Sequence, residues 1–105
     1  MTNAGSQTAL YRLDDDAIAR LLDRSQTFLN SGDIASARLL LERASEAGSA
    51  DAALMLGETF DPHFLQVLGA VGMTPDVARA RQWYEKAAAL GSNSASQRLE
   101  ALNGR

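Results

Sequence analysis

The chain contains an internal repeat, and this repeat constrains the fold more than any other feature of the sequence. Residues 33–59 align with residues 76–102, forty-three positions later, without a gap. Ten of the twenty-seven aligned pairs are identical, and they include aspartate, arginine, glutamate, glycine and serine pairs as well as alanines. A period of roughly 20–50 residues is typical of stacked supersecondary units. The repeat therefore predicts a solenoid that serves as a binding scaffold.

Hydrophobic residues at helical spacing predict an all-α chain with five main helices and no strand. Aspartates that can accept backbone hydrogen bonds begin the first helix at Asp14 and the second near Asp33. Gly48 follows the second helix, at the position where a left-handed residue ends a helix. Ser49 then caps the third helix, which stops just before Pro62 because a proline disfavours helical geometry in the preceding residue.

The second copy repeats this pattern after an insertion. Residues 61–75 are longer than the corresponding link in the first copy, and they predict one short helix followed by a glycine-hinged loop. Thr74 and Pro75 predict the start of the fourth helix, Gly91 its end, and Ser92 the start of the last helix. We expect a flexible tail and a single helical-repeat domain, with the following bounds: tail 1–12, domain 13–105, repeat one about 14–47, repeat two about 50–90, capping helix about 93–103.

Composition excludes several classes of function. The chain has 105 residues, a formal net charge of −3 and no run of Lys or Arg, so it lacks the basic face that binds a phosphate backbone, and nucleic acid is not an expected partner. No apolar run approaches the roughly 18 residues that a membrane span needs. There is no cysteine, which excludes disulfides and thiol catalysis. We expect a soluble, cytoplasmic protein, or a periplasmic one if the sequence belongs to a longer exported chain.

The second copy carries a family resemblance. The run from Trp83 to Ala88, with Gly91 and Ala95, resembles the Sel-one-like branch of the tetratricopeptide repeats, and the first copy shows the same frame more weakly. The resemblance covers roughly residues 14–103 and implies an α-solenoid of antiparallel helix pairs, with about two repeats and a C-terminal capping helix. It departs from the family in the long link 61–75 and in Glu100, which stands where a close-packed glycine would be. The resemblance implies protein–protein interaction rather than catalysis.

No group of residues supports an enzyme, a metal site or a cofactor. His63 is the only histidine, and one imidazole beside Asp61 is neither a zinc site nor a catalytic triad. The acidic run that begins at Asp14 fits helix capping better than calcium binding, which needs ligands spaced along a longer loop. Trp83 and Tyr84 are interpreted as packing residues, with Tyr84 in the core. We therefore expect no catalytic residue and no cofactor.

The resemblance places the binding surface on the first helix of each pair, over residues 14–30, 51–60 and 94–102. Seven side chains are predicted to face this concave groove: Leu22, Gln26, Asn30, Leu54, Glu58, Asp61 and Gln97. The set is polar to acidic and contains no Lys or Arg. Capture of a partner's C-terminal carboxylate by basic residues is thus disfavoured, and a neutral or basic helix or extended peptide is the expected ligand.

The inserted segment offers a second candidate surface. Its apolar residues Phe64, Leu65 and Leu68 either fold back over the groove or the next helix, which we favour, or remain exposed as a docking loop. In the alternative functional hypothesis these residues and the exposed edge of the last helix bury against a second copy of the chain. The protein would then be a structural or homo-oligomerisation segment rather than a peptide-binding scaffold.

Overall fold

The protein folds into a row of antiparallel helices. The computed structural model describes residues 13–70 and 72–104, so the predicted tail at residues 1–12 lies outside the described residues. Within the described part there are six helices and no strand: α2 (Asp15–Asn30), α3 (Ile34–Glu46), α4 (Ala50–Phe60), α5 (Pro62–Leu68), α6 (Val77–Ala89) and α7 (Ala95–Asn103). The all-α helical-repeat solenoid predicted from the sequence is confirmed. Besides the five main helices there is α5, which is the short helix expected inside the inserted segment.

The first helices form where their caps predict. The Asp14 carboxylate accepts a hydrogen bond from the backbone N–H of Ala17 at 2.8 Å, and Ser49 Oγ accepts one from Ala52 at 3.0 Å. Gly32, Gly48 and Gly91 follow α2, α3 and α6 with φ between +86° and +108°, a region that glycine enters without the steric cost of a Cβ atom.

Two predicted helix starts are wrong. Helix α6 begins at Val77 rather than at Thr74, because the Asp76 carboxylate accepts from the Arg79 N–H at 3.1 Å and acts as the cap. Helix α7 begins at Ala95 rather than at Ser92. The Ser92 N–H donates to the Ala87 carbonyl and still belongs to the end of α6. The two residues after it, Asn93 and Ser94, favour turns over helix, so α7 starts later than α4 does in the first copy.

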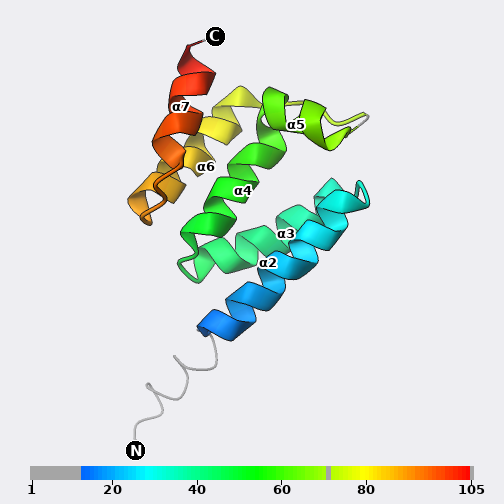
Figure 1. Cartoon of the computed structure of the whole chain (residues 1–105), viewed down its shortest axis with the longest axis vertical. Coiled ribbons are helices and arrows are strands. Elements are labelled where there is room, and N and C mark those ends of the chain that lie inside the picture. Colours follow the sequence, from blue (N-terminus) through cyan, green and yellow to red (C-terminus); the bar gives the residue numbers. More distant parts are fainter. Residues whose placement is uncertain (1–12, 71, 105) are drawn as a thin grey trace, which may run out of the picture.

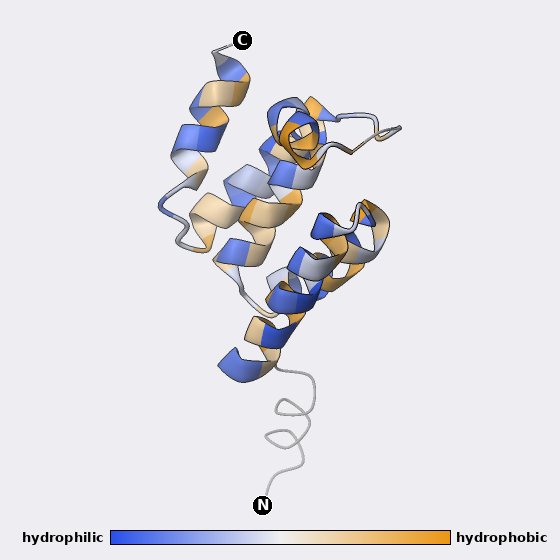
Figure 2. Cartoon of the chain, turned by 45° about the vertical axis from the view of Figure 1, so that its right-hand side comes forward, coloured by the Kyte–Doolittle hydropathy of each residue, from blue (hydrophilic) through white to orange (hydrophobic). Residues whose placement is uncertain are grey.

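The helices lie in two layers. Figure 1 shows α2, α4 and α7 toward the viewer, with α3 and α6 behind them. We call the surface formed by α2, α4 and α7 the front face, and the surface formed by α3 and α6 the rear face. Each helix is striped with hydrophobic and hydrophilic residues rather than uniformly of one kind (Figure 2), as expected of helices that bury one side.

In the core, small side chains of one helix pack against large side chains of the next. Alanines at positions 37, 44, 52, 53, 80, 87 and 95 have no exposed surface, which lets the helix axes approach closely. Leu41, Leu56 and Tyr84 are the large side chains that fill the remaining space, and they too are fully buried. Gly57 lies directly against the Tyr84 ring, so a Cβ atom there would overlap ring atoms. The buried hydrophobic residues of the described chain form four clusters. Trp83 is half-buried and packs against three of them, as expected of a residue that joins neighbouring repeats.

An arginine at the same position of each repeat copy joins a rear helix to the front helix that follows it. Arg38 on α3 donates to Thr59 Oγ1 at 3.0 Å and to the Thr59 carbonyl, and its guanidinium lies 3.8 Å from the centroid of the Phe60 ring. Its repeat partner Arg81 on α6 makes the weaker equivalent contact, to Asn103 Oδ1 at 3.3 Å. In both copies the arginine at this repeat position is thus hydrogen-bonded to the C-terminal end of the front helix that follows.

The inserted segment folds back onto the first repeat. Leu65 is only 5% exposed, and Leu68, Ala70 and Met73 pack against the core cluster formed by Leu29, Ile34 and Ala37 at the end of the α2–α3 hairpin. Helix α5 ends at Gly69, which has φ of +65°. The insertion is therefore part of the packed structure, and it closes one end of the front face.

Candidate functional site

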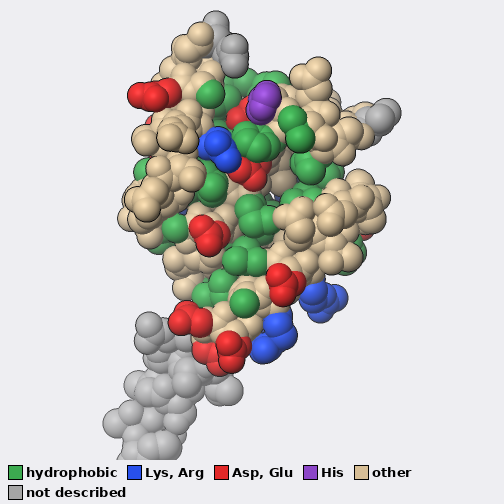
Figure 3. Space-filling view, viewed as in Figure 1, with side chains coloured by type: hydrophobic (Ala, Val, Ile, Leu, Met, Phe, Trp, Pro, Cys, Tyr) green, Lys and Arg blue, Asp and Glu red, His purple; other side chains and the backbone are tan. Residues whose placement is uncertain are grey.

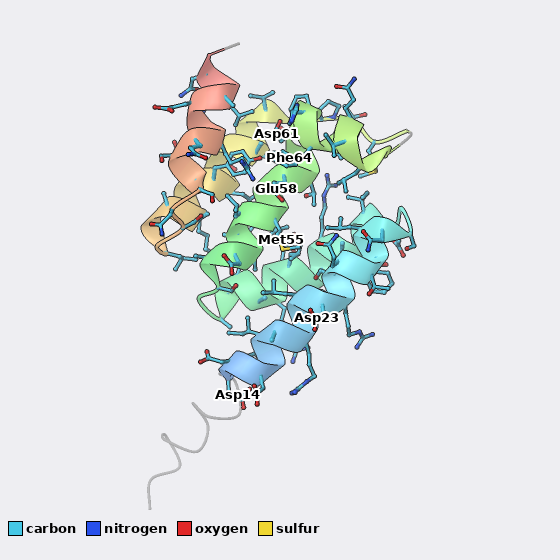
Figure 4. All side chains as sticks on the ribbon, viewed as in Figure 1. Asp14, Asp23, Met55, Glu58, Asp61 and Phe64 are labelled. Atoms are coloured by element: carbon cyan, nitrogen blue, oxygen red, sulfur yellow. The ribbon has the colours of Figure 1, made fainter. Side chains whose placement is uncertain are left out.

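The front face carries an acidic helix surface. On α4 the side chains left at least partly exposed along one stripe are Asp51, Leu54, Met55 and Glu58, which recur at helical spacing. Figure 4 labels Met55 and Glu58 on this stripe, with Asp61 and Phe64 beyond its end and Asp23 on the adjacent α2. In the space-filling view, hydrophobic side chains form a band across this face with acidic side chains beside it (Figure 3).

Charge is distributed unevenly between the two layers. The front helices α2, α4 and α7, with their cap residues, carry eight carboxylates and three arginines. The rear helices α3 and α6, with their caps, carry five carboxylates and five basic residues. The front carboxylates are Asp14, Asp15, Asp16, Asp23, Asp51, Glu58, Asp61 and Glu100, and the front arginines are Arg20, Arg24 and Arg98. All of the excess negative charge of the described residues therefore lies on the front helices.

Three of the seven predicted groove residues are exposed on this layer, and a fourth, Leu54, is half-buried. Gln26 and Asn30 are exposed on α2 and hydrogen-bonded to each other at 3.1 Å, and Gln97 is exposed on α7. Leu54 is half-buried between the two core clusters that contain Ala53 and Phe60. Their use by a partner stays a prediction, because accessibility alone does not demonstrate binding.

The other three predicted groove residues make packing contacts, an ion pair or hydrogen bonds within the chain. Leu22 is half-buried against the cluster that contains Leu41 and Leu56. Glu58 is paired with Arg98, at 3.1 Å between Oε2 and the guanidinium nitrogen Nη2. Asp61 is only 4% exposed and forms two hydrogen bonds at the junction of α4 and α5. These three side chains are mainly engaged in contacts within the chain.

The three residues of the predicted docking loop also differ in how far the fold buries their side chains. Phe64 is half-buried and its ring lies beneath Arg98, with 4.6 Å between the guanidinium carbon and the ring centroid. Leu65 is buried, and Leu68 packs against the first repeat, so neither is available to a partner as the protein stands. The reason is the fold-back of the insertion, which uses its apolar residues to cover the end of the α2–α3 hairpin.

The seven predicted groove residues include no Lys or Arg, but the structure adds one arginine beside them. Arg98 on α7 lies on the front face between Glu58 and Phe64, and both its Nε and Nη2 donate to Glu58 Oε2. The repeat register could have found it, since Arg98 aligns with Met55, a front-face residue of the first copy. Because the guanidinium is already bound to Glu58, it does not provide a free clamp for a partner's carboxylate.

Burial raises the pKa of Glu58 above its ordinary value of 4.5, and the nearby charge of Asp61 acts in the same direction, while the hydrogen bond and charge of Arg98 oppose the shift. At Tyr84, burial first and then the hydrogen bond to Asp61 raise the pKa of the hydroxyl. Tyr84 is therefore a neutral donor to Asp61 at physiological pH.

The raised pKa of Glu58 predicts a pH dependence of stability. The folded protein holds this proton to a higher pH than the unfolded chain does, so the contribution of Glu58 is full below pH 4.5 and is lost as the pH rises through the folded-state pKa. Urea unfolding of the wild type and of Glu58→Gln, compared across this range, should show the wild type losing stability relative to the variant as pH rises. A difference between the two proteins that is independent of pH would contradict the expectation.

The described residues contain no group of three or more His, Cys, Asp or Glu side chains that could hold a metal ion. Among the helices of residues 13–70 and 72–104, none is long and apolar enough to cross a membrane.

Comparison with known families gives one result. The family model described as Sel1 repeat matches residues 31–49 and 50–92 of this chain. These two matches span α3 together with the segment from α4 through α6, and they include most of the internal repeat. No curated protein and no solved structure gives a significant match.

Proposed function

This chain belongs to the Sel1 repeat family, and from that premise we propose that it is a non-catalytic adaptor that binds a basic peptide segment of a partner protein along its front face. Sel1 repeats generally mediate protein–protein interactions, and the family is typically a scaffold rather than an enzyme. The finer statement, that the front face binds and that the ligand is basic, is our own.

The uneven charge of the two layers is the observation that supports this proposal. The front helices carry seven carboxylates that are at least partly exposed, besides the buried Asp61, against three arginines, and this excess attracts a cationic segment, whereas the rear helices are balanced. The stripe from Asp51 to Glu58 adds the apolar side chains of Leu54 and Met55 between the acidic ones. A stripe with two apolar side chains between two acidic ones suits a peptide that offers both hydrophobic and basic residues.

Homo-oligomerisation, the alternative hypothesis, receives less support. It needs Phe64, Leu65 and Leu68 at the surface, and Leu65 and Leu68 instead pack against other parts of the chain. The large hydrophobic residues with the greatest exposure, Leu39 and Val67, lie on different elements, α3 and α5.

The proposal predicts that charge reversal on the front face weakens peptide binding and that the same reversal on the rear face does not. A peptide is first selected from an unbiased displayed library with the wild-type chain, and its affinity is then measured by isothermal titration calorimetry. We expect Asp23→Lys with Asp51→Lys to lower the affinity by about tenfold or more, equivalent to about 1.4 kcal/mol. All the substituted side chains are exposed, so the fold should be retained.

The matched control is Glu42→Lys with Glu85→Lys, which changes the net charge equally on α3 and α6. At physiological ionic strength the Debye length is about 8 Å, so rear charges should have little effect on a ligand at the front. Equal losses in the two variants, or the absence of any enriched peptide, would contradict the proposal.

A further inference from the structure

A cleft opens between α5 and α7 at the end of the front face. Its volume is about 590 Å³, within the range of roughly 300–1,000 Å³ that is usual for ligand sites. Pro62, Phe64, Val77, Ala101 and Leu102 provide apolar walls. The polar side chains around it are Asp61, His63, Gln66, Gln97 and Arg98. Such a cleft suits a long aliphatic stem that ends in a polar group.

Asp61 is the unusual residue of this cleft. It is a carboxylate that lines the cleft and is only 4% exposed. Its Oδ2 accepts a hydrogen bond from the Tyr84 hydroxyl at 2.7 Å, and its Oδ1 accepts one from the backbone N–H of His63 at 2.9 Å. Both donors are neutral. Each oxygen keeps a further acceptor site, because a carboxylate offers about four lone-pair positions.

No cation within the described residues is paired with Asp61. The two ion pairs of residues 13–70 and 72–104 join Arg79 to Asp76 and Arg98 to Glu58. Removing a charge from water without pairing it is costly, so a buried carboxylate of this kind is stabilised strongly by a cation that reaches it. Glu58 adds a second negative charge nearby and already occupies Arg98. Of Glu58, Arg98 and Asp61, only Asp61 is therefore left without an ion-pair partner.

We propose that the cleft binds an arginine side chain of the partner peptide, with its guanidinium on Asp61 and its methylene stem along the apolar walls. This inference rests on the proposed function, since it names the residue that the front face recognises. Arginine matches both requirements, because its stem packs on apolar surface and its planar head donates several hydrogen bonds to a carboxylate. The seating of Arg98 on the Phe64 ring shows that a guanidinium is compatible with the aromatic wall. Arg98 stays on Glu58, and the incoming guanidinium pairs with Asp61.

The test uses three short synthetic peptides of Gly and Ser that differ only in the central residue, which is arginine, its neutral isostere citrulline, or glutamate. Each peptide is titrated into the ¹⁵N-labelled full chain, and the amide chemical shifts give both the dissociation constant and the location. We expect the arginine peptide to bind about tenfold more tightly than the citrulline peptide. The shifts should centre on residues 61–66 and 97–102.

Two exposed positions on α7 provide a matched pair of variants. Ala101→Arg places a tethered guanidinium at the cleft and should abolish binding of the arginine peptide, whereas Ser96→Arg, on the same helix but not among the cleft residues, should leave it unchanged. Asp61→Asn should remove the preference for arginine over citrulline. If Asp61→Asn fails to fold, as its amide spectrum will show, the pair on α7 still decides the matter.

Equal binding of the arginine and citrulline peptides, equal effects of the two α7 variants, or no binding of the arginine peptide would each overturn the cleft assignment. Shifts confined to α2 and the first half of α4 would also overturn it, while leaving the front-face proposal intact. Failure of the proposed function has a different signature, because the library-selected peptide would then show no dependence on the front charges.

Discussion

Replacing Tyr84 with alanine is expected to lower the free energy of unfolding by about 3–5 kcal/mol, as large-to-small changes of buried aromatic residues do. The ring is fully buried in the cluster with Phe60 and Ala80, and half-buried Leu54, Leu99 and Leu102 pack around it. Tyr84 therefore joins α4, α6 and α7. Since small domains are stable by only about 5–15 kcal/mol, the alanine variant should be partly unfolded at moderate urea concentrations.

The Tyr84→Phe variant separates the contribution of the hydroxyl to stability from that of the ring. The variant keeps the packing but leaves Asp61 with one neutral donor fewer, and hydrogen bonds to charged groups contribute about 1.5–3 kcal/mol. Urea unfolding followed by far-UV circular dichroism measures both losses. Trp83→Phe is the control, since Trp83 is half-buried and contributes no hydrogen bond to Asp61. A Tyr84→Phe variant as stable as the wild type would show that the hydroxyl does not stabilise Asp61.

Gly57→Ala is expected to destabilise the protein by about 3 kcal/mol, the upper part of the usual range for overpacking. In an open helix the same change would stabilise by about 0.5–1 kcal/mol, because glycine loses more backbone entropy than alanine on folding. At position 57 the added Cβ would overlap the Cδ1 and Cε1 atoms of the fully buried Tyr84 ring, so the ring or one of the two helices would have to shift. The sign of the effect thus depends on the tyrosine ring.

A double-mutant cycle tests that dependence. In a Tyr84→Leu background the ring atoms are gone, so Gly57→Ala should cost much less or become stabilising. Urea unfolding of the four proteins gives the coupling energy. The same loss in both backgrounds would mean that the close approach of α4 and α6 at Gly57 is not what requires the glycine.

The parts of the fold that depend on neighbouring residues could be predicted from the sequence. The caps at Asp14 and Ser49 form as predicted, and glycines with positive φ follow α2, α3 and α6. The repeat register also predicts the core position of Tyr84, because it aligns with Leu41. These features follow from spacing along one helix or between two copies, and both are visible in a single chain.

The candidate site was harder to predict because its contacts join residues far apart in the sequence. Glu58 and Arg98 are forty positions apart, and Tyr84 and Asp61 are twenty-three apart. Asp61 falls at the junction of α4 and α5, where the pattern predicts a side chain that faces the groove, whereas the folded chain leaves it only 4% exposed. The fold-back of Leu68 onto the α2–α3 hairpin likewise depends on tertiary contacts that no local pattern encodes.

The insertion links these observations. Without residues 61–75 the second copy would follow the frame of the first, and there would be no α5 to form a cleft with α7. The departure from the repeat frame thus creates both the buried carboxylate of Asp61 and the aromatic wall of Phe64. The placement of the proposed arginine site on an insertion agrees with the general placement of function on loops carried by rigid scaffolds.

Whether the front face binds the partner is decided by the position of the library-selected peptide on the chain. Amide chemical-shift mapping of the ¹⁵N-labelled protein, with the peptide added to saturation, gives that position residue by residue. We expect the largest shifts on α2, α4 and α7, and at the α5 end of the front face. Shifts concentrated on α3 and α6 would place the partner on the rear face and contradict this expectation.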